Sequence, residues 1–205
     1  MGQLISFEGG DGAGKTTQIA RLANWLDGLG VPVIRTREPG GTDEAEAIRT
    51  LLVAQKADWD PLAEAMLHYA ARREHVEKRI RPALTSGTWV LCDRFYDSTI
   101  AYQCYGQGVA LEDESALRQF AIGALRPDLT LLLDIPVAAG RDRTRDRRQS
   151  RYEEMNNDLH LRVREGFLAI AHREPERVTI IDAAEDPESV AAAVRAVVAR
   201  RFDLS

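Results

Sequence analysis

A glycine-rich segment near the N-terminus combines the residue types that bind polyphosphate. Gly9 and Gly14 flank four residues and are followed by Lys15 and Thr16, which is the P-loop pattern. Glycines here let consecutive backbone N–H groups approach phosphate oxygens without obstruction by side chains. In this pattern the lysine bridges the β- and γ-phosphates and the threonine hydroxyl binds Mg²⁺. The predicted phosphate-binding loop consists of Gly9, Gly10, Asp11, Gly12, Ala13, Gly14, Lys15, Thr16 and Thr17.

Such a loop must join a buried strand to a helix, and the rest of the chain repeats that alternation. We expect strands at residues 4–7, 31–36, 88–92, 129–134 and 178–181, and, after the helix that follows the loop, helices at 43–53, 61–84, 98–104, 112–125, 136–147, 153–173 and 187–200. Five short apolar strands separated by helices predict an α/β fold with a parallel five-stranded sheet and helices on both faces. Ligands of such sheets bind outside the carboxyl ends of the strands.

The residues at these strand ends extend the chemical pattern. At 36–42, Pro39 favours an extended Glu38 and two glycines permit a tight turn, although a plain connecting turn fits equally well. The third strand ends in Asp93 and Arg94, and the fourth in Asp134. An aspartate that closes a buried strand beside a P-loop is a candidate ligand of Mg²⁺. We favour Asp93 over Asp134 because Arg94 offers a two-pronged contact to a second phosphate.

Two groups of basic residues have more than one interpretation. His68, Arg72 and His75 recur at helical spacing, and such a face taken alone more often lies in solvent. Residues 141–151 contain six arginines, a run typical of an exposed surface. Beside a P-loop, the same run also fits a lid at about residues 141–153 that neutralises a transferring phosphoryl group. We favour the lid, but the spacing does not identify its catalytic arginine.

Length and composition limit the remaining roles. The 205 residues suit one domain over 1–205, because no linker-like stretch divides them. A net charge of −5 argues against binding to nucleic acid or a membrane surface. The sequence has no run of 18 apolar residues and no leader pattern, so we expect a cytoplasmic protein. Cys92 and Cys104 fit neither a disulfide framework nor a metal site, and we expect free thiols.

Several segments together resemble bacterial thymidylate kinases. They are FEGGDGAGKTTQ at 7–18, TREPGGT at 36–42, YAAR at 69–72, DRF at 93–95 with Ser98, AYQ at 101–103 and RPDLT at 126–130. The P-loop is widely shared, but the combination of 36–42 with 93–103 is specific. The resemblance implies a P-loop NTPase-type fold with an arginine-rich lid, ATP and Mg²⁺, a homodimer, and transfer of the γ-phosphoryl group of ATP to dTMP.

The resemblance also implies roles for individual residues. Lys15, Glu38 and Asp93 are expected in catalysis, with Arg147 and Arg151 as lid candidates beside Arg145 and Arg148. Thr16 and Asp93 are expected to hold the metal. The expected substrate contacts are Asp11, Glu38, Pro39, Arg49, His68, Arg72, Arg94, Ser98, Thr99, Tyr102 and Gln103. Among these, Arg49 and Arg94 would hold the acceptor phosphate, Arg72 and Gln103 the thymine edge, and Tyr102 would disfavour ribonucleotides.

Two features of the sequence affect the choice between this function and its alternatives. Residues 10–13 carry no arginine, as in family members whose lid supplies that charge. His68 stands where the family typically has a phenylalanine stacked on thymine, and an imidazole offers a smaller apolar face. This leaves open a kinase for another or a modified pyrimidine deoxynucleoside monophosphate. A P-loop nucleotide switch is the other alternative, but the sequence lacks the Asn-Lys-x-Asp motif that reads guanine.

Overall fold

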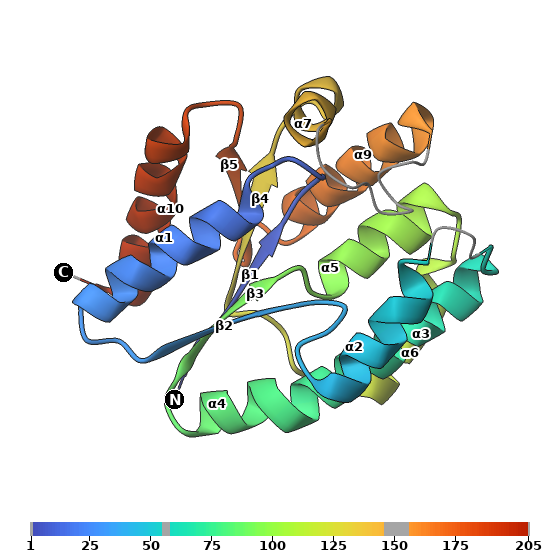
Figure 1. Cartoon of the computed structure of the whole chain (residues 1–205), viewed down its shortest axis with the longest axis horizontal. Helices are drawn as coiled ribbons and strands as arrows, with labels where there is room; N and C mark the ends of the chain where they lie inside the picture. The colour runs from blue at the N-terminus through green and yellow to red at the C-terminus, as the bar shows by residue number, and fades with distance from the viewer. Residues whose placement is uncertain (1, 55–57, 146–155, 205) are drawn as a thin grey trace.

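Five parallel strands form the centre of the molecule (Figure 1). The structure is a computed structural model that describes residues 2–54, 58–145 and 156–204. The strands are β1 (Leu4–Glu8), β2 (Val33–Arg37), β3 (Trp89–Asp93), β4 (Leu129–Asp134) and β5 (Val178–Asp182), in the order β2-β3-β1-β4-β5. Phe7 lies opposite Asp93 on one side and Leu131 on the other, so the carboxyl ends of the three central strands align. The predicted parallel five-stranded sheet is therefore confirmed.

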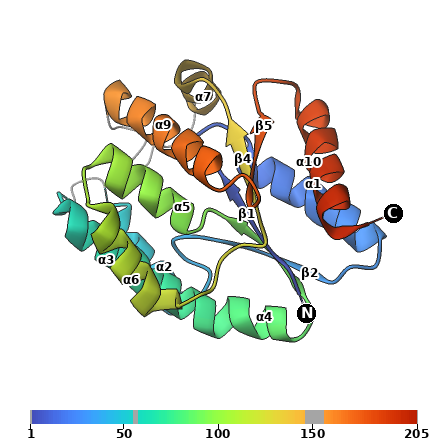
Figure 2. The same cartoon turned by 180° about the vertical axis from the view of Figure 1, so that it is seen from behind.

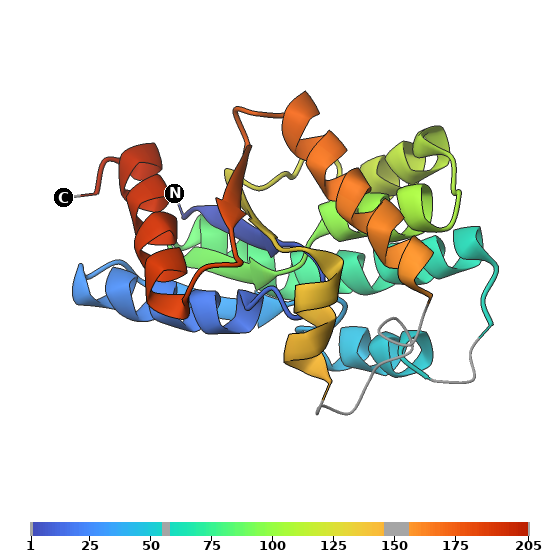
Figure 3. The same ribbon diagram turned by 90° about the horizontal axis from the view of Figure 1, so that it is seen from above.

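Helices cover both faces of this sheet. The helices are α1 (Lys15–Gly28), α2 (Asp43–Leu52), α3 (Pro61–His75), α4 (Arg81–Thr85), α5 (Tyr96–Thr99), α6 (Leu111–Ile122), α7 (Val137–Thr144), α9 (Asn157–Arg173) and α10 (Pro187–Phe202). Figures 2 and 3 show α1 and α10 on one side of the strands and α9 on the other, with α3 and α5 nearby. Two buried apolar clusters, one on each face, hold these layers against the sheet.

Two predicted helices are interrupted. The stretch predicted as one helix at 61–84 consists of α3, a π-helical turn η1 (Val76–Ile80) and α4. The helix predicted at 98–104 is the short α5 followed by the π-helical η2 (Ile100–Gly106). π-Helical turns often occur at functional sites, and apolar periodicity alone does not reveal them because the side chains still recur at nearly helical spacing. Of the two π-helical turns, η2 contributes Tyr102 and Gln103 to the cavity described below.

Helix starts follow from local side-chain chemistry. The Asp60 carboxylate accepts hydrogen bonds from the backbone N–H groups of Leu62 and Ala63, with Pro61 at the first helical position of α3. Asp186 caps α10 in the same way ahead of Pro187. The predicted helices at 136–147 and 153–173 correspond to α7 and α9, and their ends within 146–155 lie outside the described residues.

Two further observations concern the cysteines and the helices of the described part of the chain. Cys92 and Cys104 are free thiols, and both are buried. No helix among the described residues has the length and apolar character needed to cross a bilayer.

Candidate active site

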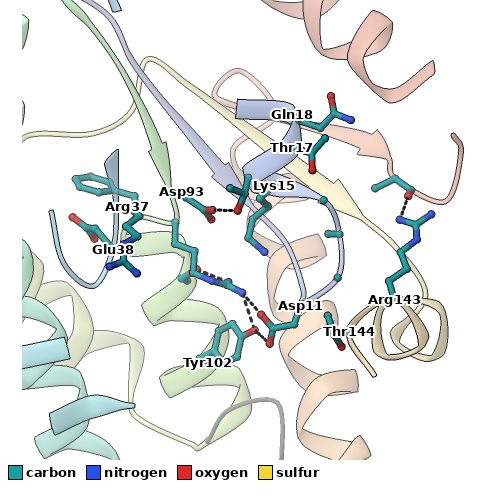
Figure 4. A pocket seen from close by; sticks show the side chains of 18 of the residues that line it. Asp11, Lys15, Thr17, Gln18, Arg37, Glu38, Asp93, Tyr102, Arg143 and Thr144 are labelled. Carbon is teal, nitrogen blue, oxygen red and sulfur yellow. Dashed lines mark hydrogen bonds and ion pairs between the residues drawn. The ribbon is translucent and has the colours of Figure 1, made fainter. Parts of the chain in front are cut away.

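A cavity of about 900 Å³ opens at the carboxyl ends of the strands. All of the predicted substrate contacts line it, as do Asp11 through Thr17 of the P-loop. Gly9 and Gly10 line instead a small neighbouring cavity behind the loop. Figure 4 shows Arg143 on one side of the P-loop and Arg37, Glu38 and Asp93 on the other. The structure therefore brings the sequence-predicted residues of the described chain into one site.

The P-loop takes its shape from glycines and from Lys15. A Cβ on Gly9 would lie 2.3 Å from the Leu133 carbonyl oxygen, and one on Gly12 would lie 2.1 Å from that of Gly140 in α7. Both residues have positive φ, so the close approach and the backbone conformation both require glycine. Lys15 is 8% exposed, and its ammonium group donates to the carbonyl oxygens of Gly9 and Gly10. Burial, with a contribution from Arg94, lowers its pKa to about 8.

The two rival aspartates differ in their partners. The Thr16 hydroxyl donates to Asp93 Oδ2 at 2.9 Å, which places a hydroxyl and a carboxylate side by side at the start of α1. Both carboxylate oxygens of Asp134 accept hydrogen bonds from Arg164, at 2.7 and 2.8 Å. Hydroxyl and carboxylate oxygens are suitable ligands for Mg²⁺. The geometry favours Asp93, because the charge of Asp134 is already paired.

Arg94 connects the P-loop to the helix that follows β3. Its backbone has a φ of 68°, an uncommon conformation for a non-glycine residue, and its side chain extends back over the loop. The guanidinium donates to Asp11 Oδ1 at 2.8 Å, to the Ser98 hydroxyl at 3.0 Å and to the Gly9 carbonyl oxygen at 3.1 Å. It also lies over the ring of Tyr102 (Figure 4). Burial opposes ionisation of Asp11, but Arg94 and Lys15 outweigh it and lower the pKa of Asp11.

Glu8 holds the segment that follows β3 in place, and it was not predicted as a site residue. It is fully buried at the end of β1 and accepts hydrogen bonds from the Phe95 backbone N–H at 2.7 Å and from the Ser98 hydroxyl at 2.6 Å. Burial, together with nearby Asp97, raises the pKa of Glu8 to about 8. The rule that ligand sites lie at strand ends pointed to this position, since Glu8 is the last residue of the first strand.

The face of α3 that carries Arg72 and His75 is buried, so the expectation of a solvent-exposed face is wrong. Arg72 is 2% exposed, and its Nε donates to Glu38 Oε2 at 2.6 Å. Its Nη2 donates to the Phe95 carbonyl oxygen and to the Thr99 hydroxyl. His75 Nδ1 lies 3.0 Å from the other oxygen of Glu38. Spacing alone did not reveal this, because the covering groups come from β2 and α5, distant in sequence.

Buried Arg72 retains one unused donor. Its Nη1 finds no hydrogen-bond partner among the described residues, although the residue lines the cavity. Burial disfavours its charge, but Glu38 outweighs this effect and the pKa of Arg72 is raised. A cationic donor is therefore fixed at this end of the cavity, available to a ligand.

Two further arginines line the cavity near residues 37–39. Arg49 was predicted, and its Nη1 donates to the Pro39 carbonyl oxygen at 2.8 Å. Arg37, at the end of β2, was not predicted, and it pairs with Glu46. The sequence could have indicated Arg37 as a site residue, because it directly follows the predicted strand at 31–36.

The opposite end of the cavity lies beside the loop that follows β5. Residues 183–187 line it together with Thr144 and Val190. Arg143 donates to the carbonyl oxygens of Ala183 and Ala184, at 2.8 and 3.2 Å. Sequence reasoning did not separate Arg143 from its neighbours in the arginine run. The sequence could have indicated that this loop lines the site, because it directly follows the fifth predicted strand.

The proposed lid lies mainly outside the described residues. Arg147, Arg148 and Arg151 fall within 146–155. Arg145 is exposed and pairs with Asp142 at 2.7 Å. The described structure therefore does not test which lid arginine acts on a phosphate.

Comparisons with known proteins agree with this arrangement. The chain is 50% identical over 206 residues to the thymidylate kinase of Caulobacter vibrioides, covering all of this chain and 99% of that protein. It is 45% identical to the thymidylate kinase of Alkalilimnicola ehrlichii, covering 97% and 93%. A crystal structure of thymidylate kinase from Ehrlichia chaffeensis superposes with a TM-score of 0.79 at 38% identity, covering 96% and 98%. The family model for thymidylate kinase matches residues 7–194, and the chain belongs to the thymidylate kinase family.

Proposed function

We propose that this protein transfers the γ-phosphoryl group of ATP to dTMP, giving dTDP and ADP. The observation that carries the proposal is one continuous cavity with two different ends. One end combines the P-loop with the loop after β5, and the other combines Arg72, Thr99 and Gln103. A cavity that joins a polyphosphate loop to a second buried polar pocket suits an enzyme that holds two nucleotides at once.

The charges between the two ends fit phosphoryl transfer. Donor and acceptor phosphates repel one another, so in-line attack requires cations on both. We infer that Lys15 holds the donor phosphates and that Arg94 and Arg49 hold the acceptor phosphate, since all three line the cavity. The Arg94 guanidinium pairs with Asp11 at 2.8 Å, and we infer that a phosphate oxygen takes over part of this pairing. The reaction needs no covalent nucleophile.

We propose Mg²⁺ as the cofactor, held by Thr16 and Asp93. Their hydroxyl and carboxylate oxygens lie 2.9 Å apart, and Thr16 is exposed to the cavity. When bound beside the donor phosphates, Mg²⁺ neutralises part of their charge. We also propose catalytic roles for Arg147 and Arg151, a homodimeric assembly and a cytoplasmic location, all from the family resemblance.

The test is a coupled assay of ADP release with ATP and each nucleoside monophosphate in turn, with and without Mg²⁺. We expect rapid, Mg²⁺-dependent turnover with dTMP. Turnover confined to another monophosphate would retain the kinase mechanism and reject the substrate. ATP hydrolysis without any acceptor preference would reject the kinase reaction itself. Sedimentation velocity of the same preparation tests the dimer.

A further inference from the structure

Two amides, one from buried Gln103 and one from half-buried Gln107, meet one carboxylate beside the Arg72 end of the cavity. Glu64 of α3 is fully buried, and Gln103 of η2 is 1% exposed. The Gln103 amide nitrogen Nε2 donates to Glu64 Oε1 at 2.8 Å, and Gln107 Nε2 donates to the same oxygen at 3.1 Å. Of these three residues, only Gln103 lines the cavity. The route from Glu64 to a ligand in the cavity therefore runs through Gln103.

The carboxylate determines which end of the Gln103 amide faces the ligand. A glutamine amide carries donors on its nitrogen and an acceptor on its oxygen, and its two rotated orientations have almost the same shape. The Glu64 oxygen accepts a hydrogen bond and only the nitrogen of the amide can donate one, so the Gln103 nitrogen turns towards Glu64. Within the described part of the chain, no group donates to Gln103 Oε1. That oxygen is therefore available as an acceptor.

Arg72 supplies the complementary group. It has donors only, and its Nη1 is buried without a partner among the described residues. Its orientation is fixed by Glu38, Thr99 and the Phe95 carbonyl oxygen. This end of the cavity therefore presents one fixed donor and one fixed acceptor. A guanidinium can only donate hydrogen bonds, whereas an amide can present either its donor or its acceptor to the ligand, depending on its neighbour.

We propose that Glu64 is a positioning residue that sets base specificity through Gln103. Resting on the proposed function, this inference identifies how the acceptor base is chosen. Thymine and uracil carry an acceptor at O4 beside the N3–H donor, which matches Arg72 and Gln103 Oε1. Cytosine carries a 4-amino donor and an unprotonated N3, so both contacts become mismatched. A buried mismatch of this kind is strongly unfavourable.

Glu64→Gln tests the inference, because a glutamine can present either its oxygen or its NH₂ group to Gln103. The Gln103 amide then no longer has an enforced orientation. We expect the ratio of kcat/KM for dTMP to kcat/KM for dCMP to fall at least about tenfold. The ratio for dTMP over dUMP should stay within about twofold, since these bases share O4 and N3–H. Both ratios are independent of the fraction of folded enzyme, so lost stability alone does not change them.

Gln107→Met provides the matched control. It removes the second amide from the same Glu64 oxygen and leaves the bond between Glu64 and Gln103 in place. We expect its dTMP-to-dCMP ratio to equal that of the wild-type enzyme within about twofold. If Glu64→Gln does not fold, Glu64→Met serves in its place, because it also leaves the Gln103 amide without a fixed acceptor. An unchanged dTMP-to-dCMP ratio in the folded Glu64 variant would overturn the proposal.

A measurement on the wild-type protein avoids the question of folding. Calorimetric titration compares dTMP with its N3-methyl derivative, which lacks the N3–H donor. We expect the derivative to bind at least about tenfold more weakly, since Gln103 Oε1 loses its donor. Equal binding would show that this oxygen does not contact the base and would overturn the proposal. Absence of dTMP turnover by the wild-type enzyme would instead reject the proposed function, which separates the two failures.

Discussion

The two ends of the cavity are built differently. At the Arg72 end the polar side chains are almost completely buried: Glu64 is 0%, Gln103 1% and Arg72 2% exposed. At the Arg143 end, Lys15 and Thr144 are buried, but Thr16, Arg143 and residues 184–187 are exposed. Buried polar groups hold their partners in one geometry and penalise a mismatched ligand. We infer that base selection is built into the core, whereas the ATP end combines buried Lys15 with exposed groups and backbone.

The largest expected effect on catalysis comes from the P-loop lysine. Lys15→Met should reduce turnover about 10³-fold or more, since it removes a cation from the donor phosphates. Its stability should not fall, because burial lowers the folded-state pKa of Lys15 from 10.5 to about 8. The folded protein therefore binds this proton less tightly than the unfolded chain, and the contribution of Lys15 to stability increases between pH 8 and 10.5.

The ADP-release assay measures the turnover of Lys15→Met, and urea unfolding at pH 7 and pH 9 measures its stability. The exposed Lys78→Met variant is the control and should retain turnover. Turnover of Lys15→Met within tenfold of the wild-type enzyme would contradict the assignment.

The next prediction compares the two ends directly through stability. Arg72→Met should lower the free energy of unfolding by about 3 kcal/mol or more, because it leaves buried Glu38 without its guanidinium partner. Arg143→Met should lower it by less than about 1 kcal/mol, since Arg143 is exposed. Urea denaturation of both variants gives the comparison. Equal losses of unfolding free energy in the two variants would show that the two ends of the cavity contribute equally to stability.

A third prediction concerns Glu8, which lies between the ends. Its folded-state pKa of about 8 exceeds the ordinary value of 4.5, so the folded protein retains a proton that the unfolded chain releases. The resulting stabilisation is complete below pH 4.5 and is lost as pH rises through 8. Between pH 5 and pH 8, the free energy of unfolding should therefore fall by about 1–3 kcal/mol less in Glu8→Gln than in the wild-type protein. Urea unfolding at these two pH values measures it, and an identical fall in both proteins would refute the assignment.

The smallest effect is expected at His68, which is half-buried and lines the cavity near Arg72. His68→Phe enlarges the apolar ring available to the base, and it should tighten dTMP binding by about 1 kcal/mol. Calorimetry with dTMP measures this change. The KM for ATP should stay constant if the two ends act separately. Unchanged or weaker dTMP binding would indicate that His68 does not stack on the base.

The sequence predicts best those features that depend on one short segment of the chain. The P-loop, the five strands and the caps at Asp60 and Asp186 depend on residues only a few positions apart. The choice of Asp93 over Asp134 as the metal ligand stays a prediction, and the structure adds a reason for it that the sequence does not contain. Arg164 pairs with Asp134 from 30 positions away, and no local pattern indicates that contact.

Long-range pairing decided the remaining features of the site. The sequence by itself determined an α/β sheet with a phosphate-binding loop and placed the chemistry at the strand ends, because apolar periodicity and glycine conformations are local properties. Tertiary structure alone decided that the Arg72 face is buried, that Glu8 supports the loop after β3 and that Glu64 orients Gln103. Each of these depends on a charge or amide meeting a partner on another element, and the free energy of such contacts is set by burial.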